Sequence, residues 1–376
     1  MLYLPLVLAL LAPLTTTALP KSNQVTFWVV GGAPSAFDKD APHSRDQDEK
    51  TIAQTIADDE QFSQLHDLLK STKGLKDDLS NPDRKYTLFA PTNEAFQSFN
   101  LSKDFKKKEF ISYHITGDSV LKIQDLRDGQ IFATQLKEKN LKNERQILRI
   151  TKRDNEIYVN MMAHIISETA ASNGNILVID RVLMPPKDIM EAVISLPQVF
   201  STLATAIFRT ELQKELEESK AITVFAPDNR AWEEGLEFED VYYLFSKEGK
   251  SDLKKLLKYH VVPSLEYSPK FRSEGKVDLK TLNGKHSISI QATQAWLASL
   301  MVIMDNSLSP LARINMVFIG DDGSIDNPEN WDYDVNEGMA KIKFADGPAE
   351  NGVVHVINKV LIPTNVQLPS KKVPSG

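Results

Sequence analysis

Apolar residues recur at every third or fourth position in two separate segments of the chain, and each segment leads into a short apolar stretch. This spacing predicts helices with one buried face. The apolar positions are Ile52, Ile56, Phe62, Leu65, Leu68, Leu69, Leu75 and Leu79 in the first segment, and Val193, Phe200, Leu203, Ile207, Leu212 and Leu216 in the second. We therefore expect two groups of helices that pack against a core and do not form a cofactor site.

The stretch that follows each helical segment has almost the same sequence in both places. Residues 87–93 read Thr-Leu-Phe-Ala-Pro-Thr-Asn, and residues 223–229 read Thr-Val-Phe-Ala-Pro-Asp-Asn. Its first residues favour a strand, and the proline keeps the alanine before it extended. Thr92 and Asp228 both supply a side-chain oxygen that can cap the next helix. Each copy therefore predicts a strand-to-helix corner, and the shared capping chemistry favours a structural role over a catalytic hydroxyl.

Two further markers recur downstream in the same order. Tyr-His closes an apolar helical segment at 113–114 and again at 259–260, and a helix C-terminus favours a protonatable histidine. Residues 173–185 and 351–363 both run from Asn-Gly through an apolar stretch to a proline. This pattern predicts a turn, a buried strand and its end. Alternating polar and apolar residues predict additional strands at 146–151, 156–160 and 286–291.

Markers repeated in one order indicate a duplicated domain, and the size of the chain agrees with this interpretation. The chain has 376 residues, of which 41% are hydrophobic and 25% are charged, as expected for two folded domains. Its net charge of -7 argues against a sequence-independent grip on nucleic-acid phosphates. The lysine run at 106–108 is flanked by acidic residues and is interpreted as a solvated helix face rather than an anion site.

The ends of the chain predict export. Residues 1–18 combine an apolar run with small residues near Ala18, which predicts a cleaved secretory signal; the alternative is an uncleaved anchor, although the run is short for a membrane span. Residues 19–50 are polar and turn-rich and are expected to be a disordered linker, in which 25–30 forms either an added strand or part of the linker. Residues 367–376 are expected to be a flexible tail without a lipid-anchor signal. The mature protein is therefore expected to be soluble.

The chain contains no cysteine, which excludes thiol catalysis and zinc-thiolate sites. Asn100 begins an Asn-Leu-Ser acceptor for N-glycosylation, which is compatible with the secretory route.

The repeated markers together resemble the fasciclin domain family, over residues 51–187 and 189–366. The resemblance implies an α+β fold with two tandem fasciclin-type domains, each a twisted β-sheet wedge flanked by helices. It also implies secreted or membrane-tethered proteins of adhesion, matrix and cell-wall contact, with no family-wide enzymatic activity or cofactor. Two domains with a signal and no lipid anchor are similar to the fungal branch, so the expected location is the vacuole lumen or the extracellular space and cell wall.

The resemblance also implies candidate binding residues at the two Tyr-His pairs, because animal members use this region for integrin contact. The matching positions are Tyr113, His114, Tyr259 and His260. A histidine in an apolar cluster at a helix end is more often a hydrogen-bonded core residue than a ligand-binding one. We therefore favour the structural interpretation for both pairs. The closing phrases differ at one position, where Asp180 of the first copy is replaced by Asn358, so a role that needs the carboxylate is not shared.

The second copy contains an insertion. Asn173 follows His114 by 59 residues, whereas Asn351 follows His260 by 91, so the extra residues fall within about 292–349. An apolar run around Trp296 predicts either an element packed on the second domain or an exposed binding surface. Acidic residues then crowd the chain at Asp321, Asp322, Asp326, Glu329, Asp332, Asp334 and Glu337. They suggest either a calcium site or, as we favour, a solvated loop, because Lys343 occupies the place of the EF-hand glutamate.

These observations lead to one main functional hypothesis and two alternatives. The main one is a non-enzymatic protein of the secretory pathway that mediates adhesion or contact with a protein or glycan at the cell wall, the cell surface or the vacuolar membrane. Two linked domains would supply affinity through surface complementarity and avidity. The alternatives are a carboxylate-dependent hydrolase, for which the usual motifs are missing, and an inert spacer.

Overall fold

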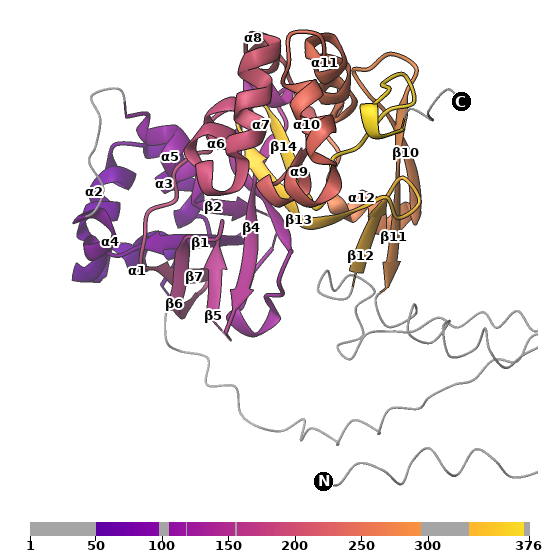
Figure 1. Ribbon diagram of the computed structural model, residues 1–376. Coiled ribbons are helices and arrows are strands. Elements are labelled where there is room, and N and C mark those ends of the chain that lie inside the picture. Colours follow the sequence, from indigo (N-terminus) through magenta and orange to yellow (C-terminus); the bar gives the residue numbers. More distant parts are fainter. Residues whose placement is uncertain (1–49, 98–104, 118, 155, 295–330, 372–376) are drawn as a thin grey trace, which may run out of the picture.

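A computed structural model describes residues 50–97, 105–117, 119–154, 156–294 and 331–371. The signal, most of the expected linker, Asn100 and Trp296 lie outside these ranges, as do 321–330 of the acidic run. Residues 50–187 form domain 1 and residues 188–371 form domain 2, and each combines a seven-stranded sheet with helices (Figure 1). The expectation of an α+β fold with two tandem domains is therefore confirmed.

Domain 1 has its helices mainly before the sheet or between its first strands. The helices are α1 (Ile52–Asp58), α2 (Ser63–Lys70), α3 (Lys73–Ser80), α4 (Asn93–Gln97) and α5 (Lys107–Tyr113). The strands are β1 (Tyr86–Pro91), β2 (Ile115–Gly117), β3 (Ile131–Lys137), β4 (Arg145–Arg153), β5 (Glu156–Val159), β6 (Ala163–Ala171) and β7 (Gly174–Ile179). The strands pair in chain order, and β7 returns to lie parallel to β1, which closes the sheet into a barrel.

Domain 2 repeats this order and has the additional helices α10 and α12. The helices are α6 (Ile189–Ser195), α7 (Pro197–Thr210), α8 (Gln213–Glu218), α9 (Asn229–Gly235), α10 (Phe238–Leu244), α11 (Lys250–Tyr259) and α12 (Ser268–Glu274). The strands are β8 (Ile222–Pro227), β9 (Val261–Val262), β10 (Lys276–Lys280), β11 (Ser287–Gln294), β12 (Trp331–Val335), β13 (Ala340–Ala349) and β14 (Gly352–Ile357). Their order is β10-β11-β12-β13-β14-β8-β9, with β14 parallel to β8.

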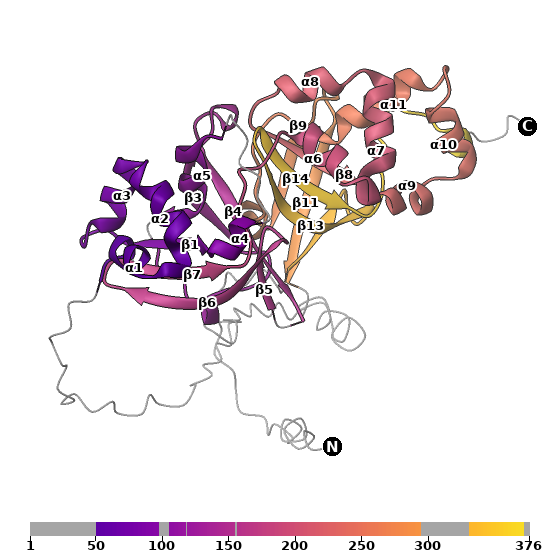
Figure 2. The ribbon, with the colours of Figure 1, turned by 90° about the vertical axis from the view of Figure 1, so that its left-hand side faces the viewer.

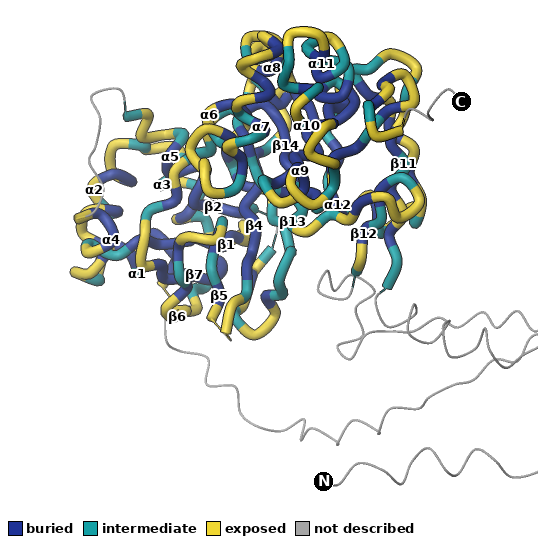
Figure 3. Tube along the Cα trace, in the orientation of Figure 1, coloured by how far each residue is buried: buried dark blue, intermediate teal, exposed yellow. Residues whose placement is uncertain are grey.

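The apolar helical positions face the sheet, as their spacing predicted. In domain 1, α1, α2, α3 and α5 bury Ile52, Ile56, Leu65, Leu69 and Ile111 against β1 and β7. The opposite face of the sheet covers a second core that includes Phe89 and Leu177. Domain 2 has the same two cores. The central strands are consequently buried on both faces: every residue of β1 and β7 is buried, and so is all of β14 except the intermediate Val356 (Figure 3).

Sheet pairing places the extra length of domain 2 in one connection. In domain 1 the β4–β5 hairpin turns between Arg153 and Glu156, which are paired. In domain 2 the equivalent strands β11 and β12 end in the pair Gln294 and Trp331. The strand β13, which lies within the interval 292–349, pairs with β14 as β6 pairs with β7. The extra residues therefore lie between β11 and β12, outside the described ranges.

Part of the acidic run is a strand, contrary to the expectation of a loop. Asp332 and Asp334 belong to β12, where they alternate with the buried residues Tyr333 and Val335. Period-two alternation of this kind is the pattern of a half-buried strand. The Lys343 ammonium forms an ion pair of 2.9 Å with the Asp228 carboxylate, which explains a cation at this position.

The prediction of a flexible tail at residues 367–376 is also partly wrong. Leu368 is buried in the helical core of domain 2, and Pro369–Lys371 form a short 3-10 helix. The Ser370 amide donates to the buried Asp240 carboxylate of α10 at 2.9 Å. Residues 367–371 are therefore held by an apolar anchor and by hydrogen bonds, while 372–376 lie outside the described ranges. No helix among the described residues is long and apolar enough to cross a membrane.

Candidate functional site

Both histidines of the Tyr-His pairs are buried and use both ring nitrogens. His114 Nδ1 lies 2.8 Å from the Phe110 carbonyl oxygen, and its Nε2 accepts a hydrogen bond of 3.0 Å from the Leu183 amide. Since Nε2 accepts, the proton of the neutral ring is on Nδ1, which donates to the carbonyl of the preceding helical turn. The second domain repeats these contacts with His260, Leu256 and Leu361.

Burial keeps these two rings neutral. It lowers the pKa of His114 to about 4, and the hydrogen bond to the Phe110 carbonyl opposes this shift. Burial likewise lowers the pKa of His260 to about 4, against the opposing bond to the Leu256 carbonyl. A neutral ring with both nitrogens engaged and no solvent access has no free nitrogen for general acid–base chemistry. Each histidine instead ties the end of a helix to the segment that follows the closing strand.

The tyrosines tie the same helix end to a hairpin. The Tyr113 hydroxyl donates to the Ile147 carbonyl of β4 at 3.1 Å and accepts from Asn160 Nδ2 at 2.8 Å. Asn160 stands at the β5–β6 turn with a positive φ of 50°, and its Oδ1 accepts from the Arg149 amide. The second domain repeats this set with Tyr259, Ser287, Asn336 and Ser289. The Tyr-His pair thus joins helix, sheet and hairpin in each domain.

The candidate binding residues are therefore inaccessible in this structure. Tyr113 and His114 are both 0% exposed, and His260 and Tyr259 are 1% and 7% exposed. A partner could not touch these side chains without opening the domain, so direct binding by the Tyr-His pairs is not supported. Trp296 lies outside the described residues, and its binding role stays a prediction.

The polar residues of the repeated phrase have local roles that the sequence only partly indicated. Thr92 Oγ1 and Asp228 Oδ1 accept from the amides of Ala95 and Ala231, so the predicted helix caps are present. The hydroxyl of Thr87 donates to the Ser119 carbonyl and accepts from the Leu121 amide, which fixes the loop after β2. Thr223 makes the same pair of bonds to Ser264 and Glu266 in the second domain. The asparagine that ends each phrase, Asn93 or Asn229, accepts from an amide at the start of an earlier helix.

The asparagine of the closing phrase is the least expected of these ties. Asn173 is fully buried; its Oδ1 accepts from the Ile52 amide at 2.8 Å, and its Nδ2 donates to the Leu79 and Asn81 carbonyls. It thus satisfies an unpaired group at the start of α1 and others at the end of α3. In the second domain the corresponding residues are Asn351, Ile189, Leu216 and Ser219.

The predicted turn is present, because Ser172 and Asn173 connect the paired residues Ala171 and Gly174, but the glycine is needed for a further reason: two backbones approach closely there. A Cβ at Gly174 would lie 1.9 Å from the Tyr86 carbonyl oxygen, and one at Gly352 would lie 2.1 Å from that of Ile222. The parallel pairing of the closing strand with the strand of the Phe-Ala-Pro phrase brings these atoms together. The Asp180–Asn358 difference is equally structural, because each Oδ1 accepts from the amide of a paired strand, that of His164 or Lys341.

The two domains meet along β4 and β13, which lie side by side (Figures 1 and 2). Arg149 of β4 is 5% exposed, and its Nε donates to the Ala345 carbonyl of β13 at 2.8 Å. Its guanidinium carbon lies 3.9 Å from the centroid of the Phe344 ring, a cation–π contact. Burial lowers the Arg149 pKa, and the nearby Asp128 carboxylate opposes the shift. The side chain of Gln146 also crosses the interface and donates to the Ala349 carbonyl at 3.0 Å.

Further along this interface, the carboxylates of Glu138, Glu350 and Glu109 are close enough to affect one another. Asn140 Nδ2 donates to Glu350 Oε1 at 2.9 Å, and the Asn140 carbonyl accepts from the Ala221 amide of domain 2. Burial raises the pKa of Glu138 to about 7, with Glu350 and Glu109 adding to the shift. Glu138 is therefore partly protonated at neutral pH, and its charge depends on the presence of the other domain.

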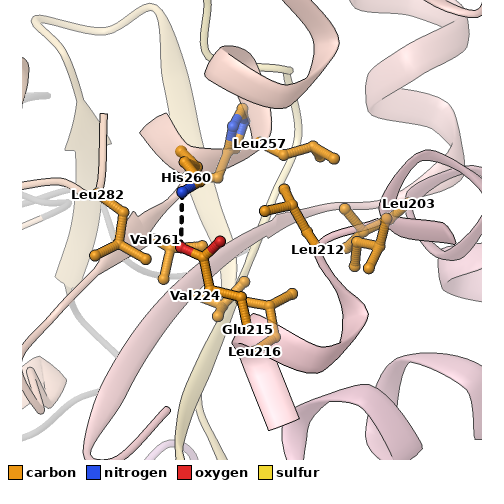
Figure 4. A pocket seen from close by; sticks show the side chains of 11 residues that line it. Leu203, Leu212, Glu215, Leu216, Val224, Leu257, His260, Val261 and Leu282 are labelled. Atoms are coloured by element: carbon orange, nitrogen blue, oxygen red, sulfur yellow. Dashed lines mark ion pairs between the residues drawn. The ribbon is translucent and has the colours of Figure 1, made fainter. Parts of the chain in front are cut away.

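A small apolar recess lies among α7, α8, α11 and β8 of domain 2 (Figure 4). Leucines 203, 212, 216 and 257 line it, and an ion pair of 2.7 Å joins Glu215 to Lys258 beside it. Its volume is about 20 Å³, little more than one water molecule needs. This recess has no converging polar groups and is too small for a substrate. Among the described residues, no group of three or more histidine or acidic side chains is placed to hold a metal ion.

Comparison with known proteins agrees with the duplicated architecture. The family model of the Fasciclin domain matches residues 60–185 and again 198–363. The chain is 28% identical over 228 residues to aurofusarin biosynthesis cluster protein S of Gibberella zeae, covering 56% of this chain and 54% of that protein. It is 27% identical over 314 residues to transforming growth factor-beta-induced protein ig-h3 of Sus scrofa, covering 84% of this chain and 38% of that one. The chain thus spans about half or less of the length of these relatives.

Among solved structures, a domain pair of the insect cell adhesion molecule fasciclin I matches 80% of this chain and 96% of its own, with 18% sequence identity and a TM-score of 0.38. Because the two family matches cover most of the chain, it belongs to the fasciclin domain family.

Proposed function

We propose that this protein is a non-enzymatic component of the secretory pathway that mediates adhesion or contact with a protein or glycan at the cell wall, the cell surface or the vacuolar membrane. One observation carries the proposal: the chemistry-bearing residues that the two domains share are buried and fully engaged in holding elements together. Contact must then use outer surfaces. The β4–β13 interface supports this, because it presents two domains in one orientation and so favours simultaneous engagement.

Fractionation of cells that produce the protein with a C-terminal tag tests the proposal. We expect the protein in the culture medium, the cell-wall fraction or the vacuolar fraction, and we expect purified protein to bind isolated walls or membranes saturably. Recovery mainly from the cytosol, or failure of purified protein to bind any of these surfaces, would overturn it. The fraction that retains the protein also separates the vacuolar location from the extracellular one.

Within the described part of the chain, no specific site supports the hydrolase alternative. The buried imidazoles have no free nitrogen, and the recess in domain 2 is apolar. The carboxylates that do gather, at Glu138 and Glu350, lie at the domain interface, and Glu350 is held by Asn140.

A further inference from the structure

The outer side of α10 exposes two large aromatic rings. Phe238 is 85% exposed and Tyr242 is 72% exposed, although both are large and one is wholly apolar. The rings are one helical turn apart; their centroids are 6.4 Å from each other and their planes differ by 28°, so the rings stack. Exposed aromatic surface of this kind often marks a contact site, because its burial contributes strongly to binding. We call Phe238 and Tyr242, with the flanking Glu237 and Glu239, the α10 patch.

The α10 patch has a rigid base. Asp240, about half a turn from each exposed ring and so on the opposite side of α10, is 2% exposed and accepts from both the amide and the hydroxyl of Ser370. Leu368, just before this contact, is buried in the core of domain 2, and Leu244 packs into the same core. The C-terminal segment therefore holds α10 from beneath. A helix fixed in this way presents its outer side chains with little ordering cost on binding.

The surroundings of the rings are acidic. Glu237 and Glu239 are exposed on either side of Phe238 in the chain. Over 229–244 the exposed acidic residues are Glu233, Glu234, Glu237 and Glu239, against the single basic residue Arg230. Lys247 after α10 and Lys371 of the described C-terminal segment add exposed cations. On α9 and α10 themselves, exposed carboxylates therefore outnumber cations.

We propose that the α10 patch binds a cationic, arginine- or lysine-bearing segment of a partner protein, an inference that rests on the proposed contact function. The faces of the two rings accept guanidinium or ammonium groups by cation–π contact, and the flanking carboxylates complement the same charges. A neutral glycan could stack on the rings and donate hydroxyl hydrogen bonds to the carboxylates, but it carries no positive charge to complement them. The acidic rim therefore favours the cationic peptide.

Titration with a fluorescein-labelled octapeptide of alternating glycine and arginine tests the proposal on the full chain. The double variant Phe238→Leu/Tyr242→Leu keeps apolar area but removes the ring faces, and we expect it to weaken peptide binding by about tenfold. The variant Glu237→Gln/Glu239→Gln should weaken binding most at low salt, where exposed charges are least screened. Phe208→Leu on α7, which is 47% exposed in the wild type, serves as the aromatic control and should leave binding unchanged.

The same variants are then tested for retention on isolated cell walls and membranes, and laminarin serves as a glycan probe. The inference is overturned if the leucine variant keeps peptide binding, or if it loses laminarin binding while peptide binding stays intact. Thermal unfolding of each variant excludes misfolding, since the rings are exposed and their replacement should leave the transition in place. If wild-type protein is itself not retained on any surface, the proposed function fails. If wild type and leucine variant are retained equally, only the assignment to the α10 patch fails.

Discussion

At the centre of domain 1, Leu177 lies opposite Phe89 in the parallel strand pair, whereas in domain 2 the residue opposite Phe225 is His355. Both positions are 0% exposed. His355 stacks on Phe225 with 5.3 Å between centroids, donates from Nε2 to the Glu266 carbonyl and accepts at Nδ1 from the Asp346 amide. The buried contact with the phenylalanine is thus made by an apolar side chain in domain 1 and by a polar side chain in domain 2. The repeated fold tolerates either chemistry when every polar atom has a partner.

The polar contact belongs to a larger network of domain 2. The buried Asp346 carboxylate accepts from the amide and hydroxyl of Ser268, and Arg272 donates to that hydroxyl and to the phenol of Tyr333. Arg149 of domain 1 contacts β13 through the Ala345 carbonyl, directly beside Asp346 in the chain. The two domains consequently share their internal ties and differ in buried charge. Domain 2 should therefore respond more strongly to pH.

Removing the buried asparagine of the closing phrase, Asn173 or Asn351, should have the largest effect on the free energy of unfolding. The loss should be similar in the two domains. Asn173→Ala leaves the Ile52 amide and the Leu79 carbonyl buried without a partner, and we expect a loss of about 3–5 kcal/mol in the free energy of unfolding of domain 1. Asn351→Ala should destabilise domain 2 by a similar amount. Guanidinium unfolding followed by circular dichroism measures both.

Asn173→Asp keeps the acceptor oxygen but places a carboxylate in a fully buried site against the Leu79 and Asn81 carbonyl oxygens, so it should cost at least as much as the alanine variant. A loss below about 1 kcal/mol for alanine would contradict the tie itself.

Acidification should distinguish the domains. The pKa of His114 and of His260 is lowered to about 4, against about 6.5 in an unfolded chain, and burial also lowers the pKa of His355. A lowered pKa in the folded state stabilises the protein fully above 6.5, and this contribution is lost as pH falls from 6.5 to 4. We expect a loss of up to about 3 kcal/mol each for His114 and His260, and His355 adds to the loss in domain 2, so domain 2 should unfold first.

Tryptophan fluorescence isolates the response of domain 2 once Trp28, which precedes domain 1, is replaced by phenylalanine, because residues 51–187 contain no tryptophan and Trp232 is buried in domain 2. Its thermal transition should fall more steeply between pH 6.5 and 4 than the transition followed by circular dichroism, to which the helices of both domains contribute. The variant His355→Leu, which copies Leu177, should reduce the difference in pH dependence between the domains. Identical pH dependence of the two signals in the wild type would contradict the prediction that the stability of domain 2 depends more strongly on pH.

The sequence predicted the duplicated fold because its evidence is local. Periodic apolar positions, a proline after an extended alanine and a capping oxygen each act within a few residues, so α2, β1 and the cap at Asp228 were predicted correctly. The asparagine tie was not predictable, since Asn173 meets Ile52 across 121 residues. The predicted Asn-Gly turn is present between β6 and β7, but the close backbone approach at Gly174 was not predictable, because it is set by pairing with the distant strand β1. Exposure of Phe238 was equally hidden, because helical spacing cannot tell which of two apolar faces meets the core.

Glu138 should have the smallest effect on the free energy of unfolding. Its contribution to stability is lost as pH rises, whereas that of the histidines is lost as pH falls. Burial raises its pKa to about 7, Glu350 and Glu109 raise it further, and Lys106 opposes them. Because the raised pKa means that the folded protein binds the proton more tightly, the stabilisation is complete below about 4.3, the unfolded pKa, and is lost as pH rises through 7.

Since Glu138 is only half-buried, solvent screening limits the change to about 1 kcal/mol. Glu138→Gln should abolish this part of the pH dependence between 5 and 8, and Glu144→Gln is a control on the same hairpin. Because Glu350 belongs to domain 2, the pH dependence caused by Glu138 should depend on contact between the domains.

Two cysteines introduced at the exposed Asp77 and Lys247 of this cysteine-free chain allow the distance between the domains to be followed by energy transfer. A wild-type pH response that survives in Glu138→Gln would show that Glu138 does not couple the domains.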